Sequence, residues 1–308
     1  GGVGFENDGF TLDYTGGWNS GNQTGHTYVA WNWDMGGSNA TLTAGSIDST
    51  VRANPTYGQS IVSYTGTGSN ATVAHGLSSA PEWIIVKDRS NSNSWQVYHT
   101  SLGNTAAAFL DLNAAADTSE ASYWNSTSPT SSLINLGTNT KVNHNSHTYI
   151  AYAFHSVSGY SKFGTYTGDA TTDNSLSVTV GFKTAFLMVK RTDSTGNWII
   201  VDSARNPDVN DIDLYLKANT TDTEATQSGN LFKFTSTAFT LGGNLADVNA
   251  DGGTYVYMAF ADKREFAYYL DQSGNNNDFQ SNNLTESDIM VDSPTNNFAT
   301  MKIGRASL

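Results

Sequence analysis

The chain has 308 residues, a net charge of −13, only 14% charged residues and no cysteine. Phosphate contacts need clustered lysine and arginine, so this charge argues against nucleic-acid binding. The missing cysteines exclude thiol catalysis, cysteine-based zinc sites and iron–sulfur clusters. No apolar run approaches the ~20 residues of a membrane helix, so we expect no membrane insertion. Abundant serine, threonine, asparagine and glycine predict strands joined by polar turns.

The N-terminal segment 1–38 carries two strand patterns, at 10–12 and 28–33, that match the last two strands of two longer repeats further along. We therefore predict that 1–38 is the C-terminal half of a β repeat whose first half is missing. Because Gly1 falls in the middle of this pattern, we expect the chain to be part of a longer or processed protein. A linker rich in serine, threonine and asparagine is predicted at 39–57.

The first full repeat is predicted at 58–158. Residues 60–65 mostly alternate apolar and polar, as a half-buried strand does, and so do residues 94–99. The continuous apolar run at 83–86 is typical of a strand covered on both faces. Residues 105–116 are compatible with a short helix.

The second full repeat is predicted at 160–264, because four landmarks of the first recur in the same order about 100 residues later. The matching pairs are Ser63-Tyr64-Thr65-Gly66 with Thr165-Tyr166-Thr167-Gly168, Lys87 with Lys190, Trp95 with Trp198, and Tyr149 to Phe154 with Tyr255 to Phe260. Each repeat has enough apolar strands for its own core. The fold class predicted is therefore all-β, with tandem antiparallel β-sandwich repeats in an elongated, fibre-like arrangement.

One loop resembles half of a calcium site. Asp247, Asn249 and Asp251 stand at the spacing D-x-N-x-D-G and are the candidate metal ligands. The twelfth position is Met258 rather than glutamate, and a strand pattern follows instead of a helix. A polar hairpin turn is the preferred interpretation, calcium is the alternative, and no other cofactor is expected.

The histidines and lysines have competing interpretations. His144 and His147 lie in a predicted hairpin loop and could share a metal, although solvated loop histidines are the preferred interpretation. Lys87 and Lys190 each end an apolar strand, where they would form an ion pair inside the repeat or reach into water. Most tryptophans are expected to fill narrow β cores, as the repeated position of Trp95 and Trp198 indicates.

No catalytic constellation is evident. Gly-x-Ser-x-Gly and phosphate-binding glycine loops do not occur in the sequence, and no acid recurs between the repeats with a plausible partner. We therefore expect that the protein is not an enzyme.

The order Ser60 to Gly66, His75-Gly76-Leu77, Pro81, Ile84 to Lys87, Trp95 and Tyr98-His99 resembles a repeat of tail-fibre and other structural proteins of marine bacteriophages. The segments 271–279 and 292–299 are similar to the part that follows such repeats and often leads into a concanavalin-like, lectin-type sandwich. The resemblance implies that 266–308 is an extended tail or the start of a lectin-like segment. The second repeat departs from the pattern, because it lacks the His-Gly-Leu and Tyr-His elements.

The resemblance implies a structural component of an extracellular virus particle, a tail fibre or appendage that contacts polysaccharide on the host surface. A capsid decoration or spacer protein and a capsule depolymerase are the alternatives. The expected partners are other virion proteins, a host glycan and further copies of the chain, with a homotrimer favoured because phage fibres are usually trimeric.

Overall fold

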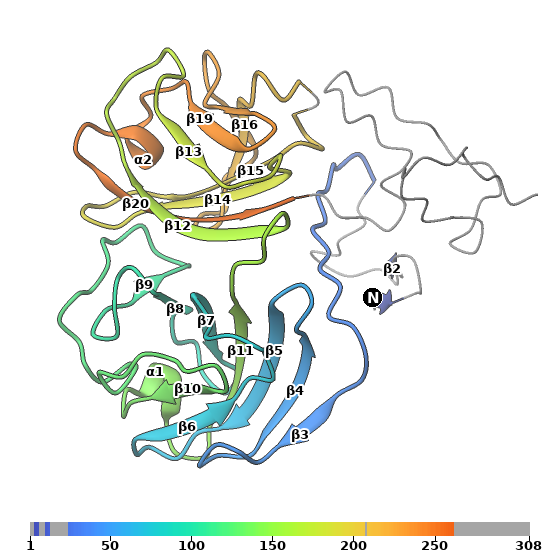
Figure 1. Ribbon diagram of the computed structural model, residues 1–308, viewed down its shortest axis with the longest axis vertical. Helices are drawn as coiled ribbons and strands as arrows, with labels where there is room; N and C mark the ends of the chain where they lie inside the picture. The colour runs from blue at the N-terminus through green and yellow to red at the C-terminus, as the bar shows by residue number, and fades with distance from the viewer. Residues whose placement is uncertain (1–2, 6–9, 13–23, 207, 262–308) are drawn as a thin grey trace, which may run out of the picture. The chain divides into compact units, whose positions relative to one another are not determined.

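The computed structural model describes residues 3–5, 10–12, 24–206 and 208–261 (Figure 1). The predicted tail at 266–308 lies outside these residues. The chain divides into two compact units, 1–34 and 35–308, which are taken separately below.

The N-terminal unit contains one antiparallel hairpin of β1 (Val3–Phe5) and β2 (Phe10–Leu12). The structure assigns no strand to residues 24–34, whereas the sequence comparison predicts one at 28–33. In the full repeats the matching strand is central and is paired on both sides. Both neighbours of that strand come from the first half of the repeat, and no first-half pattern is recognised in residues 1–38, so the strand has no such partners there.

The second unit begins with a β-sandwich made of a seven-stranded and a two-stranded sheet. The large sheet has the order β3-β4-β5-β11-β7-β8-β9, and β10 pairs with β6 in the small one. The strands are β3 (Ala40–Leu42), β4 (Ser49–Asn54), β5 (Gln59–Thr65), β6 (Ala71–Ala74), β7 (Trp83–Asp88), β8 (Gln96–His99), β9 (Ala108–Phe109), β10 (Leu133–Leu136) and β11 (Thr148–Phe154).

A second β-sandwich follows, with a six-stranded sheet in the order β12-β20-β14-β15-β16-β17 and a three-stranded sheet in the order β13-β19-β18. Its strands are β12 (Ser161–Thr167), β13 (Ser177–Thr179), β14 (Phe186–Arg191), β15 (Trp198–Asp202), β16 (Leu214–Lys217), β17 (Ala225–Thr226), β18 (Phe232–Phe234), β19 (Ala238–Leu241) and β20 (Thr254–Phe260). The strand pairs within all of these sheets are antiparallel, so the predicted all-β sandwich fold is confirmed. The elongated arrangement stays a prediction.

The segment 39–57 is not a linker, because β3 and β4 lie in it. Val51 of β4 pairs with Val62 of β5 and is buried in the core of the first sandwich. Its neighbours Thr50 and Arg52 are exposed, so β4 alternates like a half-buried strand. The high content of serine and threonine, taken as a linker signal, here reflects the polar face of that strand.

Each sandwich has one short helical turn, α1 (Thr140–Asn143) and α2 (Ala246–Asn249), held by the same contacts. The hydroxyl of Tyr64 donates to Val142 O at 2.7 Å, and that of Tyr166 donates to Val248 O at 2.6 Å. Burial raises the pKa of both tyrosines well above the ordinary value, so both remain donors at neutral pH.

A buried asparagine completes this shared arrangement. Asn143 donates to the carbonyls of Ser69 and Gly137 and accepts from the amide of Thr67. Asn249 makes the equivalent bonds with Thr171, Gly243 and Asp169. The fold therefore repeats in detail, down to individual hydrogen bonds.

The large sheets of the two sandwiches are also covered on the faces turned away from their cores. In β7 and β15, Ile84 and Ile199 point into the two cores, whereas Trp83 and Trp198 alternate with them and face the other way. These two tryptophans are fully buried and contact each other edge to face, with ring centroids 6.0 Å apart. The prediction that 83–86 is covered on both faces is confirmed.

The segment that follows β8 in the first sandwich contacts the second sandwich directly. Residues 105–116 form β9 and turns rather than a helix. Ala116 N donates to Thr192 O at 2.9 Å, and Asn113 O accepts from Gly196 N at 2.8 Å. Met188, Val256 and Met258, which alternate with core residues along β14 and β20, are also buried.

Candidate functional site

Two of the three predicted metal ligands have other partners, and the third is exposed. Asp247 accepts hydrogen bonds from the backbone amide and the side-chain amide of Asn197, at 2.8 and 3.1 Å. Asn249 is fully buried in the three bonds described above, and Asp251 is exposed in the following turn. The side-chain oxygens of Asp247 and Asn249 serve separate contacts, which favours the interpretation as a polar turn. In the part of the chain that the structure describes, no group of three or more histidine, aspartate and glutamate side chains could hold a metal ion.

Two buried histidines of the first sandwich have structural roles. His75 Nε2 lies 3.1 Å from Thr130 O, which can only accept, so Nε2 carries the proton and Nδ1 accepts from Leu77 N. His99 Nδ1 accepts from Ser101 N at 3.0 Å, and the ring meets Trp83 edge to face. Burial lowers the pKa of His75 and lowers that of His99 to about 4, so both are neutral near pH 7.

The two repeated lysines close equivalent turns. Lys87 Nζ donates to the carbonyl of Asn93, and Lys190 Nζ donates to the carbonyl of Gly196 at 2.9 Å. Lys190 is fully buried and also lies 3.5 Å from Asn113 O of the first sandwich. Burial lowers the pKa of Lys190 to about 8. Neither ammonium group forms an ion pair among the described residues, and the buried Lys190 does not reach into water, so binding to turn carbonyls is a role that neither sequence interpretation predicted.

The loop between α1 and β11 gathers three ionisable side chains. The rings of His144 and His147 lie with centroids 4.0 Å apart, and His147 Nδ1 lies 2.9 Å from Asp88 Oδ2. Ser90 N and Asn93 Nδ2 also donate to the Asp88 carboxylate. Desolvation raises the pKa of Asp88, but the hydrogen bonds from these three residues outweigh it and leave the pKa below its ordinary value. Sequence reasoning missed Asp88, because it is 59 positions from His147 and meets it only through the pairing of β7 with β11.

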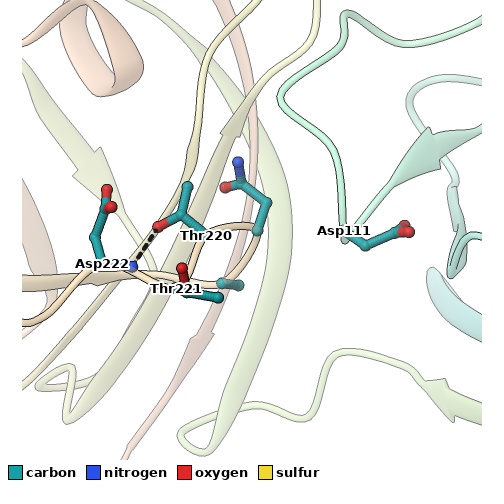
Figure 2. A pocket seen from close by; sticks show the side chains of 6 residues that line it. Asp111, Thr220, Thr221 and Asp222 are labelled. Atoms are coloured by element: carbon teal, nitrogen blue, oxygen red, sulfur yellow. Dashed lines mark hydrogen bonds between the residues drawn. The ribbon is translucent and has the colours of Figure 1, made fainter.

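An open polar hollow of about 550 Å³ lies between the two sandwiches (Figure 2). Asp111, which follows β9, lies on one side of the hollow with its carboxylate directed away from the turn after β16 in this view, and the lining residues are Asp111, Ala218, Asn219, Thr220, Thr221 and Asp222. The backbone amide of Asp222 donates to Thr220 Oγ1 at 3.3 Å, which shapes that turn. Sequence reasoning missed these residues, since no pattern links position 111 to positions 218–222.

Some lining residues of the hollow hold its turns by hydrogen bonds, and others are exposed. Asn219 accepts from the backbone amide of Trp198 at 2.8 Å and donates to Asn197 at 2.9 Å, so its side chain is used in holding the turn. Asp111 accepts from the backbone amide of Trp95 at 3.0 Å. The carboxylates and hydroxyls of Asp111, Thr221 and Asp222 remain exposed and present hydrogen-bonding groups to solvent.

In the described residues, the fold and the hollow together define a tandem β-sandwich protein with an open polar hollow at its surface. The chain belongs to the family described as a domain of unknown function, DUF7483, whose model matches residues 3–264. The match spans the N-terminal hairpin and both sandwiches. No curated protein and no solved structure matches the chain. No helix in the described ranges has the length and apolar character needed to cross a membrane.

Proposed function

We propose that the chain is a structural component of a virus particle, a bacteriophage tail fibre or related appendage, and that it contacts polysaccharide on the host surface through the hollow between its sandwiches. The hollow is the observation that carries the second part. Its exposed carboxylates and hydroxyls are the groups that exchange hydrogen bonds with sugar hydroxyls. The first part is supported by the repeat and by its resemblance to phage structural proteins.

The surroundings of the ionisable groups favour binding over catalysis. His75, His99 and Lys190 are buried and hydrogen-bonded to backbone groups, and Asp247 fixes a turn. In the hollow, Asp222 also pairs with Lys217 at 2.9 Å on the exposed surface. An adhesin needs a fixed polar surface of this kind, whereas a depolymerase needs an acid and a base at defined positions on a scissile bond.

Rigid attachment of the two sandwiches also suits a particle component. Their contact combines the buried Trp83–Trp198 pair with backbone hydrogen bonds of Asn113 and Ala116. A hollow with one wall from each sandwich keeps its shape only if the two do not move apart. In an assembled homotrimer, three weak sugar contacts would act together, which multiplies the avidity.

A glycan array with the purified chain, combined with an assay for released reducing sugar, tests the proposal. Asp111→Ala and Asp222→Ala are expected to weaken glycan binding at least tenfold. Asp251→Ala, which removes an exposed acid of the second sandwich outside the hollow, serves as the matched control and is expected to bind as the wild type does.

Each alternative has its own result in these assays. Release of oligosaccharide would indicate a capsule depolymerase, and absence of binding to any glycan would indicate a spacer or decoration protein. Binding that survives Asp111→Ala and Asp222→Ala would place the glycan site elsewhere. Light scattering of the same sample measures the oligomeric state, for which three copies are expected.

A further inference from the structure

The loop that joins α1 to β11 holds two imidazole rings side by side at the surface of the first sandwich. The ring planes of His144 and His147 meet at 42°, with the centroids 4.0 Å apart. His144 is exposed, and the side chain of His147 is 24% exposed, so solvent ions reach both.

Hydrogen bonds fix which ring nitrogen of each neutral imidazole carries the proton. His147 Nδ1 lies 2.9 Å from the Asp88 carboxylate, and His144 Nδ1 lies 3.0 Å from the carbonyl oxygen of Asn145. Both oxygens only accept, so each Nδ1 donates its proton and each Nε2 keeps its lone pair. A carboxylate on the Nδ1 of a histidine is the common arrangement behind a metal-binding Nε2.

The backbone of this loop is held in place on both sides of the pair. His144 N donates to the hydroxyl of Tyr149 at 2.7 Å, and His147 O accepts from Gly66 N at 2.8 Å. Between them, Ser146 adopts φ +64°, a left-handed conformation that is costly for a residue with a side chain. The two rings are therefore brought together by the fold before any ligand arrives.

The second sandwich builds the same loop without the histidines. Ala250 N donates to the hydroxyl of Tyr255 at 2.7 Å, and Gly253 O accepts from Gly168 N at 2.8 Å. Gly252 has φ +66° where the first sandwich has serine, and Arg191 stands at the position of Asp88. The turn therefore needs neither the imidazoles nor the carboxylate, so their presence in the first sandwich is not required by the fold.

We propose that His144 and His147 bind a divalent transition-metal ion through their Nε2 atoms, with Asp88 orienting His147 and water completing the coordination. Imidazole nitrogen suits Zn²⁺, Ni²⁺ and Cu²⁺, whereas Ca²⁺ and Mg²⁺ select oxygen ligands. Zinc–nitrogen bonds of about 2.0–2.1 Å in a tetrahedral site separate two ligand nitrogens by roughly 3.3 Å. Rings whose centroids are 4.0 Å apart are close enough for both to bind one ion, and His144 is exposed, so its ring can adjust to the ion.

Isothermal titration of the untagged full-length chain with ZnCl₂ or NiCl₂ tests the site, and one ion per chain is expected. His144→Ala and His147→Gly introduce the residues that the same turn carries in the second sandwich, so both variants should keep the fold. Each is expected to weaken binding at least tenfold. Asp88→Asn is expected to weaken it less, because an amide oxygen still accepts from Nδ1 but without the negative charge.

His26→Ala is the control, since it removes an exposed histidine of the N-terminal unit and should leave the affinity unchanged. The proposal is overturned if the wild-type chain shows no saturable binding. It is also overturned if the double variant His144→Ala/His147→Gly binds as tightly as the wild type. Circular dichroism spectra that match the wild type show that a loss of binding is not a loss of folding.

Discussion

The indole nitrogen of Trp198 in the second sandwich donates a 2.7 Å hydrogen bond to the carbonyl oxygen of Phe109 in the first. Both groups are buried, and the ring of Trp198 also meets the ring of Trp83. One side chain thus combines apolar burial with a polar contact across the junction between the sandwiches.

Replacing Trp198 with phenylalanine should lower the free energy of unfolding by roughly 1–3 kcal/mol, because the carbonyl of Phe109 loses its partner in a buried place. Urea denaturation followed by circular dichroism measures this loss. Trp95→Phe at the equivalent position of the first repeat is the control. Trp95 is only partly buried, so its replacement should cost less than about 1 kcal/mol. Equal losses for the two variants would show that the junction contact adds nothing.

Asn143→Ala and Asn249→Ala should each lower the free energy of unfolding by roughly 2–4 kcal/mol, because three backbone groups lose their partner in each case. The two losses should be similar, since the contacts are equivalent. Asn145→Ala in the exposed loop should change it by less than about 0.5 kcal/mol. A large loss for one sandwich only would contradict the equivalence of the two helical turns.

Stability should fall below about pH 6.5 through His99. Its pKa is lowered from 6.5 to about 4 by burial, so between these pH values the unfolded chain binds a proton that the folded chain does not. The stabilisation is complete above pH 6.5 and is lost as the pH falls toward 4, at about 1.4 kcal/mol per pH unit. His99→Asn keeps an acceptor for Ser101 N without titrating. The difference in unfolding free energy between wild type and variant, measured from pH 7 to 4.5, should therefore change with this slope; a constant difference would argue against it.

Ser146→Gly should raise the free energy of unfolding by roughly 0.5–1 kcal/mol. The left-handed backbone of residue 146 costs a serine more than a glycine, and the second sandwich has Gly252 there. Thermal denaturation compares this variant with Asn145→Gly, which gains no such relief and should be destabilised. A lower melting temperature for Ser146→Gly than for the wild type would contradict the assignment of strain.

Local patterns in the sequence predict the strands and the repeat well. The alternation at 60–65 and the apolar run at 83–86 each depend on a few neighbouring residues, and both became strands of the large sheet. The match between Lys87 in the first repeat and Lys190 in the second likewise located two equivalent turns. The hairpin of β3 and β4 was missed because its strands are short and mostly polar.

Contacts between segments that are far apart in the sequence could not be predicted from those local patterns. Trp95 and Trp198 occupy the same place in the two repeats, yet only Trp198 is fully buried, because the first sandwich covers it. Matching positions in the two repeats predict where a residue lies in its strand, but they do not predict what packs against the outer face of that strand. For the same reason the Asp88–His147 pair and the hollow at Asp111 emerge only once the sheets are assembled.

The covered outer faces also bear on how a duplicated gene segment evolves. Two copies are no longer separable once each buries part of the other. The second copy here would expose Trp198 if it were produced alone, because the ring of Trp198 contacts Trp83 and its indole binds Phe109 O in the first copy. Recombination or proteolysis near residue 160 would then yield two fragments that aggregate through exposed apolar surface, instead of two small proteins. Both sandwiches lie in one compact unit, 35–308, and we expect them to fold and be expressed together.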